Sequence, residues 1–281
     1  MKIQPKTLPC HPPHWKYDLP GTSEQPEKHP YWKELSPPPN NLDQTFIEFT
    51  RSMLMIRGLG VFVGILVFSA NLIMLAFSIY ITFAPGRYAD PSGLMIAGLI
   101  TIAACWVFIP FIRLDIELPR DEPIRFNRLR RKVYFYQFKY DRIFFLSKKK
   151  WGVKPEVHAW DDLKAEACRV YAPGHGGLIE NIVIAAHKPG TNEVIARYFF
   201  AHDIHNGEHY WAIARLFMQQ GPDALPEFEN RPRNWNNDTE AGFPRRLAPK
   251  VNWPADIDLE SRTAPTQENL NETSRPRGPS A

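Results

Sequence analysis

The stretch GLGVFVGILVFSANLIMLAFSIYITFAPG, residues 58–86, contains no charged side chain. A second uncharged stretch, PSGLMIAGLITIAACWVFIPFI, follows at residues 91–112. At about 1.5 Å per residue, a helix of either length crosses a hydrocarbon core of about 30 Å. A buried helix of a soluble protein rarely continues for about 20 residues without a charge. We therefore predict a membrane helical hairpin over residues 58–113, with transmembrane helices at about 58–83 and 92–112.

Basic residues flank this hairpin unequally. Arg51 and Arg57 precede the first stretch, and the connecting segment carries only Arg87. The basic residues after the second stretch are Arg113, Arg120, Arg125, Arg128, Arg130, Arg131 and Lys132. The positive-inside rule then places both termini in the cytoplasm and the short connecting segment outside. The first apolar stretch starts too late in the chain to be a cleaved signal peptide.

Small and polar residues inside the two stretches indicate how the helices pack. Gly60 and Gly64 form one small-xxx-small pair, and Gly93 and Ala97 form another. Such pairs let helix backbones approach closely, which suits either the hairpin itself or a homo-oligomer. Asn71 lies near the middle of the first stretch, where an amide is expected to find a partner on a neighbouring helix.

The bulk composition resembles that of an ordinary soluble protein, with 44% hydrophobic and 23% charged residues and a mean hydropathy of -0.35. Basic residues exceed acidic ones by only 34 to 30, so we expect no nucleic-acid partner. The three scattered cysteines exclude a disulfide framework and a cysteine zinc module.

Proline separates the regions of the chain. Of the 27 prolines, ten lie in residues 1–39 and nine lie in residues 222–279. Because proline removes backbone donors and keeps the preceding residue extended, we predict disordered tails at 1–40 and 223–281. Aromatic residues such as Trp15 and Trp253 favour docking of parts of each tail on the folded domain. Residues 41–57 are predicted to form a cytoplasmic lead-in helix.

Residues 120–222 read as a strand-rich α+β cytoplasmic domain. The predicted strands are 124–126, 133–138, 142–147, 157–160, 164–171, 178–188 and 193–200. Their short connections make this sheet of about seven strands antiparallel. A C-terminal helix follows at 206–220, capped by Asn206 and stopped by Gly221 and Pro222. This order is that of a pleckstrin-homology-like domain, although a simple α+β sheet gives a similar string.

No segment carries a catalytic motif. The three histidines His202, His205 and His209 are the metal-ligand candidates, because two imidazoles four residues apart can share one helix face. Since Asn206 looks like the helix cap, His205 is expected outside the helix, and we favour a polar strand-to-helix turn. The motifs HExxH, GxSxG and GxxxxGK[ST] are absent. We predict a protein that is not an enzyme and has no cofactor and no bound metal.

The basic residues near the second stretch have two interpretations. They are Arg125, Arg128, Arg130, Arg131 and Lys132, with a second basic loop at Lys148, Lys149 and Lys150. They serve either as topology determinants on a solvated hairpin edge or as contacts to acidic headgroups or an acidic protein.

Three segments carry a resemblance to a known family: PIRFNRLRRKVYFYQF at 123–138, WDDLKAE at 160–166 and WAIARLFMQQGPDALP at 211–226. Over residues 42–230 the chain resembles a family of uncharacterised two-span bacterial inner-membrane proteins, a domain of unknown function. Its members are often found beside type VI secretion genes and toxic effectors. The resemblance implies an immunity or accessory role and carries over no catalytic residue.

Two functions follow as expectations. In the first, the domain binds a protein partner, an effector or a secretion component, at the lipid bilayer. In the alternative, the protein is a membrane scaffold or sensor whose basic hairpin binds anionic headgroups. A metal-dependent membrane enzyme built on the three histidines is the weakest reading.

Overall fold

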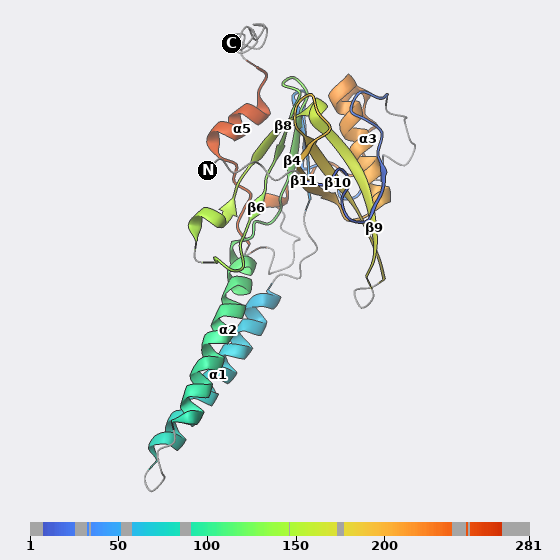
Figure 1. The fold of residues 1–281 in the computed structure, drawn as a ribbon. Coiled ribbons are helices and arrows are strands. Elements are labelled where there is room, and N and C mark those ends of the chain that lie inside the picture. Colours follow the sequence, from blue (N-terminus) through green and yellow to red (C-terminus); the bar gives the residue numbers. More distant parts are fainter. Residues whose placement is uncertain are drawn as a thin grey trace, which may run out of the picture.

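The computed structural model describes residues 8–25, 33, 35–51, 58–84, 91–145, 147–172, 177–237, 246 and 248–265. Two long apolar helices, α1 (Leu59–Phe83) and α2 (Ser92–Glu117), form an antiparallel hairpin that projects from a sheet domain (Figure 1). By length and composition, both helices are able to cross a membrane. The helix α2 continues past the predicted end at 112, with Pro110 inside it. Its last turns are held because Leu114 and Leu118 are buried against side chains of the domain.

The first pair of small residues packs the hairpin. A Cβ atom on Gly60 would lie 3.0 Å from the carbonyl oxygen of Phe111, and one on Gly64 would lie 2.7 Å from Cγ1 of Ile112. The absence of a side chain at Gly60 thus leaves room for the backbone of α2, and at Gly64 it leaves room for the Ile112 side chain.

The second pair behaves differently. Ala97 is buried, whereas a Cβ on Gly93 would meet nothing within 4 Å. The side-chain amide of Asn71 donates to the carbonyl oxygen of Val67 at 2.8 Å, within its own helix. The expected bond from the Asn71 amide nitrogen to a neighbouring helix is thus replaced by a bond to the preceding turn.

The domain contains two main antiparallel sheets. The first sheet has the order β2-β3-β4-β5-β8, with β2 at Asn41–Leu42, β3 at Phe46–Phe49, β4 at Ile124–Asn127, β5 at Lys132–Phe135 and β8 at Glu156–Ala159. The second has the order β1-β9-β10-β11, with β1 at Trp15–Asp18, β9 at Leu163–Ala172, β10 at Gly177–His187 and β11 at Val194–Ala201. A short ribbon pairs β6 (Phe138–Lys139) with β7 (Gly152–Val153).

The helical hairpin is an insertion between two paired strands. The strand β3 precedes α1 in the chain, yet it pairs with β4, which follows α2, with Phe49 opposite Ile124 and Phe46 opposite Asn127. The prediction of a lead-in helix over 41–57 is therefore wrong for residues 41–49, which form β2, a bend and β3. Residues 52–57 of that prediction lie outside the described residues. The apolar side chains of β3 fill the domain core, so tertiary burial decides the conformation. The domain accordingly begins well before residue 120.

The core lies between the two sheets and the helix α3 (Ile204–Gln220). Trp160 and Trp211 meet in it with ring centroids 5.0 Å apart. The helix begins two residues earlier than predicted, because the Asp203 side chain accepts a hydrogen bond from the Asn206 backbone N–H at 2.8 Å. Asp203, not Asn206, is the cap, and His205 lies inside the helix.

Six of the seven predicted strands correspond to β4, β5, β8, β9, β10 and β11. The seventh, residues 142–147, is wrong, because residues 142–145 form a turn. The carboxylate of Asp141 accepts hydrogen bonds from the backbone N–H groups of Ile143 and Phe144, which bends the chain.

The described parts of the tails dock on the domain. The strand β1 pairs with β9, and Leu19 and Leu35 are buried in the core. The helix α5 (Ala255–Arg262) packs near β4 and β5 (Figure 1), and Trp253 is buried against Tyr136. The prediction of disordered tails is thus wrong for these segments, and the docking expected from their aromatic residues is confirmed for Trp253. Short 3-10 turns occur at Lys148–Lys150, Trp160–Asp162, Pro222–Ala224 and Trp235–Asn237.

Candidate functional site at the junction of hairpin and domain

A buried arginine fixes the point where the helical hairpin leaves the domain. Arg51, two residues after β3, is 5% exposed. Its guanidinium donates to the carbonyl oxygens of Glu122 at 2.6 Å, Phe199 at 2.8 Å and Tyr136 at 2.9 Å. Burial lowers the pKa of Arg51, while nearby acids, Glu122 foremost, act in the opposite direction. One side chain thus joins the segments that flank the helices to a strand of the second sheet.

Asp121 completes this junction on the other side. The carboxylate accepts hydrogen bonds from the backbone N–H groups of Arg51 at 3.0 Å and Glu122 at 2.8 Å, and from the Asn40 amide at 3.2 Å. It is 2% exposed, and burial raises its pKa despite these hydrogen bonds. The two chain segments that lead into and out of the hairpin are therefore held to each other directly.

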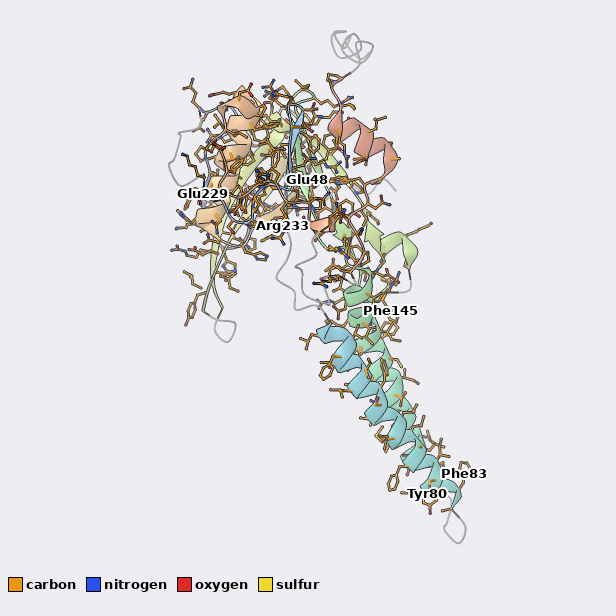
Figure 2. The ribbon with its side chains drawn as sticks, turned by 180° about the vertical axis from the view of Figure 1, so that it is seen from behind. Glu48, Tyr80, Phe83, Phe145, Glu229 and Arg233 are labelled. Carbon is orange, nitrogen blue, oxygen red and sulfur yellow. The ribbon has the colours of Figure 1, made fainter. Side chains whose placement is uncertain are left out.

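A polar cavity of about 130 Å³ lies beside the junction. Arg125 lines it and is 4% exposed, forming ion pairs with Glu48 and Asp258, the latter at 2.7 Å. The guanidinium also lies 4.5 Å from the ring centroid of Trp253. Figure 2 shows Glu48 in the interior of the domain. Trp253 and Asp258 belong to the C-terminal segment, so their contacts with Arg125 hold that segment against the first sheet.

The other basic residues of the predicted lipid- or partner-binding set are also engaged. Arg130 donates to Thr263 and Ala264, Arg131 pairs with Asp161, and Lys132 pairs with Glu260. The guanidinium of Arg128 lies against Gly221, at the end of α3. This turn between β4 and β5 lies at the end of the domain away from α1 and α2 (Figure 1).

Lys148, Lys149 and Lys150 lie instead just after the turn at residues 142–145, whose Phe145 contacts α2. The structure thus does not bring the two basic groups together as one surface.

Sequence reasoning missed a hydrogen-bonded cluster that connects the two sheets. The Tyr198 hydroxyl donates to Glu156 at 2.6 Å, His158 Nε2 lies 2.5 Å from the same hydroxyl, and Lys139 pairs with Glu156. Burial raises the pKa of Tyr198 and lowers that of His158. Burial opposes ionisation of Glu156, but hydrogen bonds from Lys139 and Tyr198 bring its pKa below the ordinary value.

This cluster holds strands together and is poorly suited to supply a nucleophile. A tyrosine with a raised pKa stays protonated near neutral pH. No local spacing reveals the cluster, because Glu156 and Tyr198 lie on strands of different sheets and meet only through the tertiary fold.

In the described part of the chain, the three predicted metal-ligand histidines do not come together as one group of ligands. His205 and His209 have ring centroids 4.4 Å apart on α3, while His202 lies against the Phe199 ring. The group whose ligand atoms do lie within 4.8 Å of one another is His11, Asp18 and Glu166. Glu166 is already paired with Arg197 at 2.8 Å, so a metal ion would have to compete with a guanidinium for it.

An apolar helical hairpin inserted into an antiparallel domain thus defines the class of this protein. Residues 101–244 match the model of a family of unknown function, DUF6708, and the chain belongs to this family. The matched region runs from the middle of α2 through the second sheet and α3. No curated protein and no solved structure matches the chain.

Proposed function

We propose that this chain is a multi-pass protein of the bacterial inner membrane with both termini in the cytoplasm. The observation that carries the proposal is the exposed apolar surface of a hairpin whose base is fixed to the domain by Arg51. Leu72, Ile73 and Phe83 are each 70% exposed or more, and similar residues continue along both helices. An apolar surface this extensive is costly in water and is favourable in a hydrocarbon core.

We infer that the domain is pleckstrin-homology-like. Support comes from the succession β3, β4, β5 and β8 in one sheet, then β9, β10 and β11 in another, followed by α3. On this interpretation, the membrane hairpin occupies the connection between the first two strands of the domain.

We propose a non-enzymatic role in which the domain binds a protein partner at the membrane, as an immunity or accessory protein for a type VI secretion effector. The family resemblance supplies the type VI context. The polar clusters described above supply the second argument, because each links segments of this chain and has a structural task.

Co-expression tests this role. We expect the protein to protect a sensitive bacterium against the toxic product of a neighbouring gene, and to co-purify with that product from detergent. A matched variant replaces residues 58–117 with a short glycine-serine linker, which the pairing of Phe49 with Ile124 permits. If this variant binds the partner without protecting, anchoring and binding are separate requirements. If the full chain neither protects nor co-purifies, the proposed role is wrong.

The basic residues near the β4–β5 turn do not support the alternative role as a lipid sensor. The side chains of Arg125, Arg130, Arg131 and Lys132 are paired within the chain, and their turn faces away from the helices. We therefore do not propose the β4–β5 turn as a headgroup site.

A further inference from the structure

Residues 140–145 and 147–151, named here the interface loop, lie against α2 at the base of the hairpin. The ring of Phe145 meets the ring of Trp106 with centroids 5.4 Å apart. Arg113 of α2 donates to the carbonyl oxygen of Phe145, and Arg142 lies 5.1 Å from the ring centroid of Phe111. Figure 2 shows Phe145 beside the helices rather than in the domain.

These contacts set the depth of the loop along the helix. Arg113 is the first charged residue after the uncharged stretch 91–112. Trp106 precedes it by seven residues, or about 10 Å of helix. The loop therefore covers a part of α2 that belongs to the uncharged stretch. In a membrane, this part lies at the boundary between headgroups and hydrocarbon.

The turn directs apolar side chains outward at this level. Phe145 is buried against α2, whereas Ile143 is 65% exposed and Phe144 is 56% exposed. The hydrogen bonds from Ile143 and Phe144 to Asp141 hold the backbone in this arrangement. Two neighbouring exposed apolar side chains in a turn that packs on α2 indicate a surface that contacts an apolar environment.

The same loop carries positive charge beside these apolar side chains. Arg142, Lys149 and Lys150 are exposed. The ammonium of Lys150 lies 3.7 Å from the ring centroid of Phe144 and 3.1 Å from the Asp141 carboxylate. Apolar side chains flanked by cations match the boundary of an anionic bilayer, where side chains enter the acyl region and cations meet phosphates.

We propose that the interface loop lies in the headgroup layer of an anionic bilayer, with Ile143 and Phe144 toward the acyl chains and Arg142 and Lys149 toward lipid phosphates. The inference rests on the proposed membrane location of α1 and α2, and it assigns to the loop a lipid contact that those helices do not require.

Depth measurement in vesicles tests the proposal. The full-length protein is reconstituted in phosphatidylethanolamine and phosphatidylglycerol, with its native cysteines replaced by alanine. Single cysteines at Ile143, Ile73 and Leu259 then carry an environment-sensitive dye. Ile73 lies on α1, and Leu259 is an exposed apolar control on α5, away from the helices.

We expect lipid-borne quenchers to reduce the emission at positions 73 and 143, and iodide in water to reduce it at position 259. Quenching of position 143 by iodide, with position 73 quenched from the lipid, overturns the proposal and leaves the membrane location intact. Quenching of position 73 by iodide overturns the membrane location itself.

The charge requirement has its own variant. Each cation near an anionic surface favours binding by roughly fivefold. Lys149→Gln should therefore increase the water-exposed fraction of the dye at position 143 by up to about fivefold, and only when phosphatidylglycerol is present. Lys188→Gln, at an exposed lysine in the turn between β10 and β11, is the matched control. Equal effects of the two substitutions would remove the phosphate contact from the proposal.

Discussion

Replacing Arg51 by methionine removes the side chain that joins the hairpin to both sheets. Three carbonyl oxygens then lose a donor: that of Tyr136, whose bond is buried, and those of Glu122 and Phe199, whose bonds are partly buried. Each unsatisfied acceptor costs about 1–3 kcal/mol, so the gross loss is about 3–9 kcal/mol. Removing a desolvated charge offsets part of it, which leaves an expected destabilisation of about 3–5 kcal/mol.

Thermal unfolding of the full chain in detergent, followed by near-UV circular dichroism, measures this change. At roughly 2–4 °C per kcal/mol for a domain of this size, the Tm should fall by about 6–20 °C. Arg51→Lys keeps the charge but loses the planar guanidinium, so its Tm should lie between that of the unchanged protein and that of Arg51→Met. Arg131→Met is the matched control, because that side chain is 51% exposed and its ion pair contributes about 0–1 kcal/mol. Equal effects of Arg51→Met and Arg131→Met would refute the junction as described.

Three further predictions follow. Burial lowers the pKa of His158, so the unfolded chain takes up the proton first, and the unfolding free energy should fall as pH drops below about 6.5. His158→Gln should flatten this slope in urea titrations, and an unchanged slope would contradict the role given to His158. Trp253→Ala should release the C-terminal segment from Arg125 and Tyr136, at a cost of about 3–5 kcal/mol in unfolding free energy. Rapid proteolysis of residues 248–265 would report this release, whereas Trp15→Ala, at a half-exposed side chain, should leave the segment protected. Gly64→Val should separate α1 from α2 and lower hairpin stability in micelles, whereas Gly93→Val should have little effect; equal losses would contradict the packing at Ile112.

The helices and most strands were predictable because their signals are local. An uncharged stretch identifies a long apolar helix without reference to the rest of the chain. Runs of apolar residues between turn residues predict β9, β10 and β11 in the same local way. The strand β3 was missed because its partner β4 follows it only after the whole hairpin, and pairing at such separation leaves no mark in a window of neighbouring residues.

The segment 142–147 shows the opposite error. Its apolar residues suggested a strand, but Asp141 bends the backbone and α2 offers Phe145 a surface. Both interpretations of the basic residues of the β4–β5 turn, a solvated edge and a contact to headgroups or a partner, assume side chains without partners in the chain. Their partners Asp258 and Glu260 lie more than a hundred residues away, in a segment whose proline content suggested a disordered tail.

In the proposed topology, α1 and α2 cross a membrane and the domain lies in the cytoplasm. Labelling of single cysteines with a membrane-impermeant maleimide tests it in intact spheroplasts. Phe83, at the end of the hairpin remote from the domain (Figure 2), and Leu259 on α5 are both exposed positions. We expect Phe83→Cys to be labelled in intact spheroplasts and Leu259→Cys to be labelled only after lysis. Labelling of Leu259→Cys in intact cells, or protection of both positions, would contradict the proposed topology.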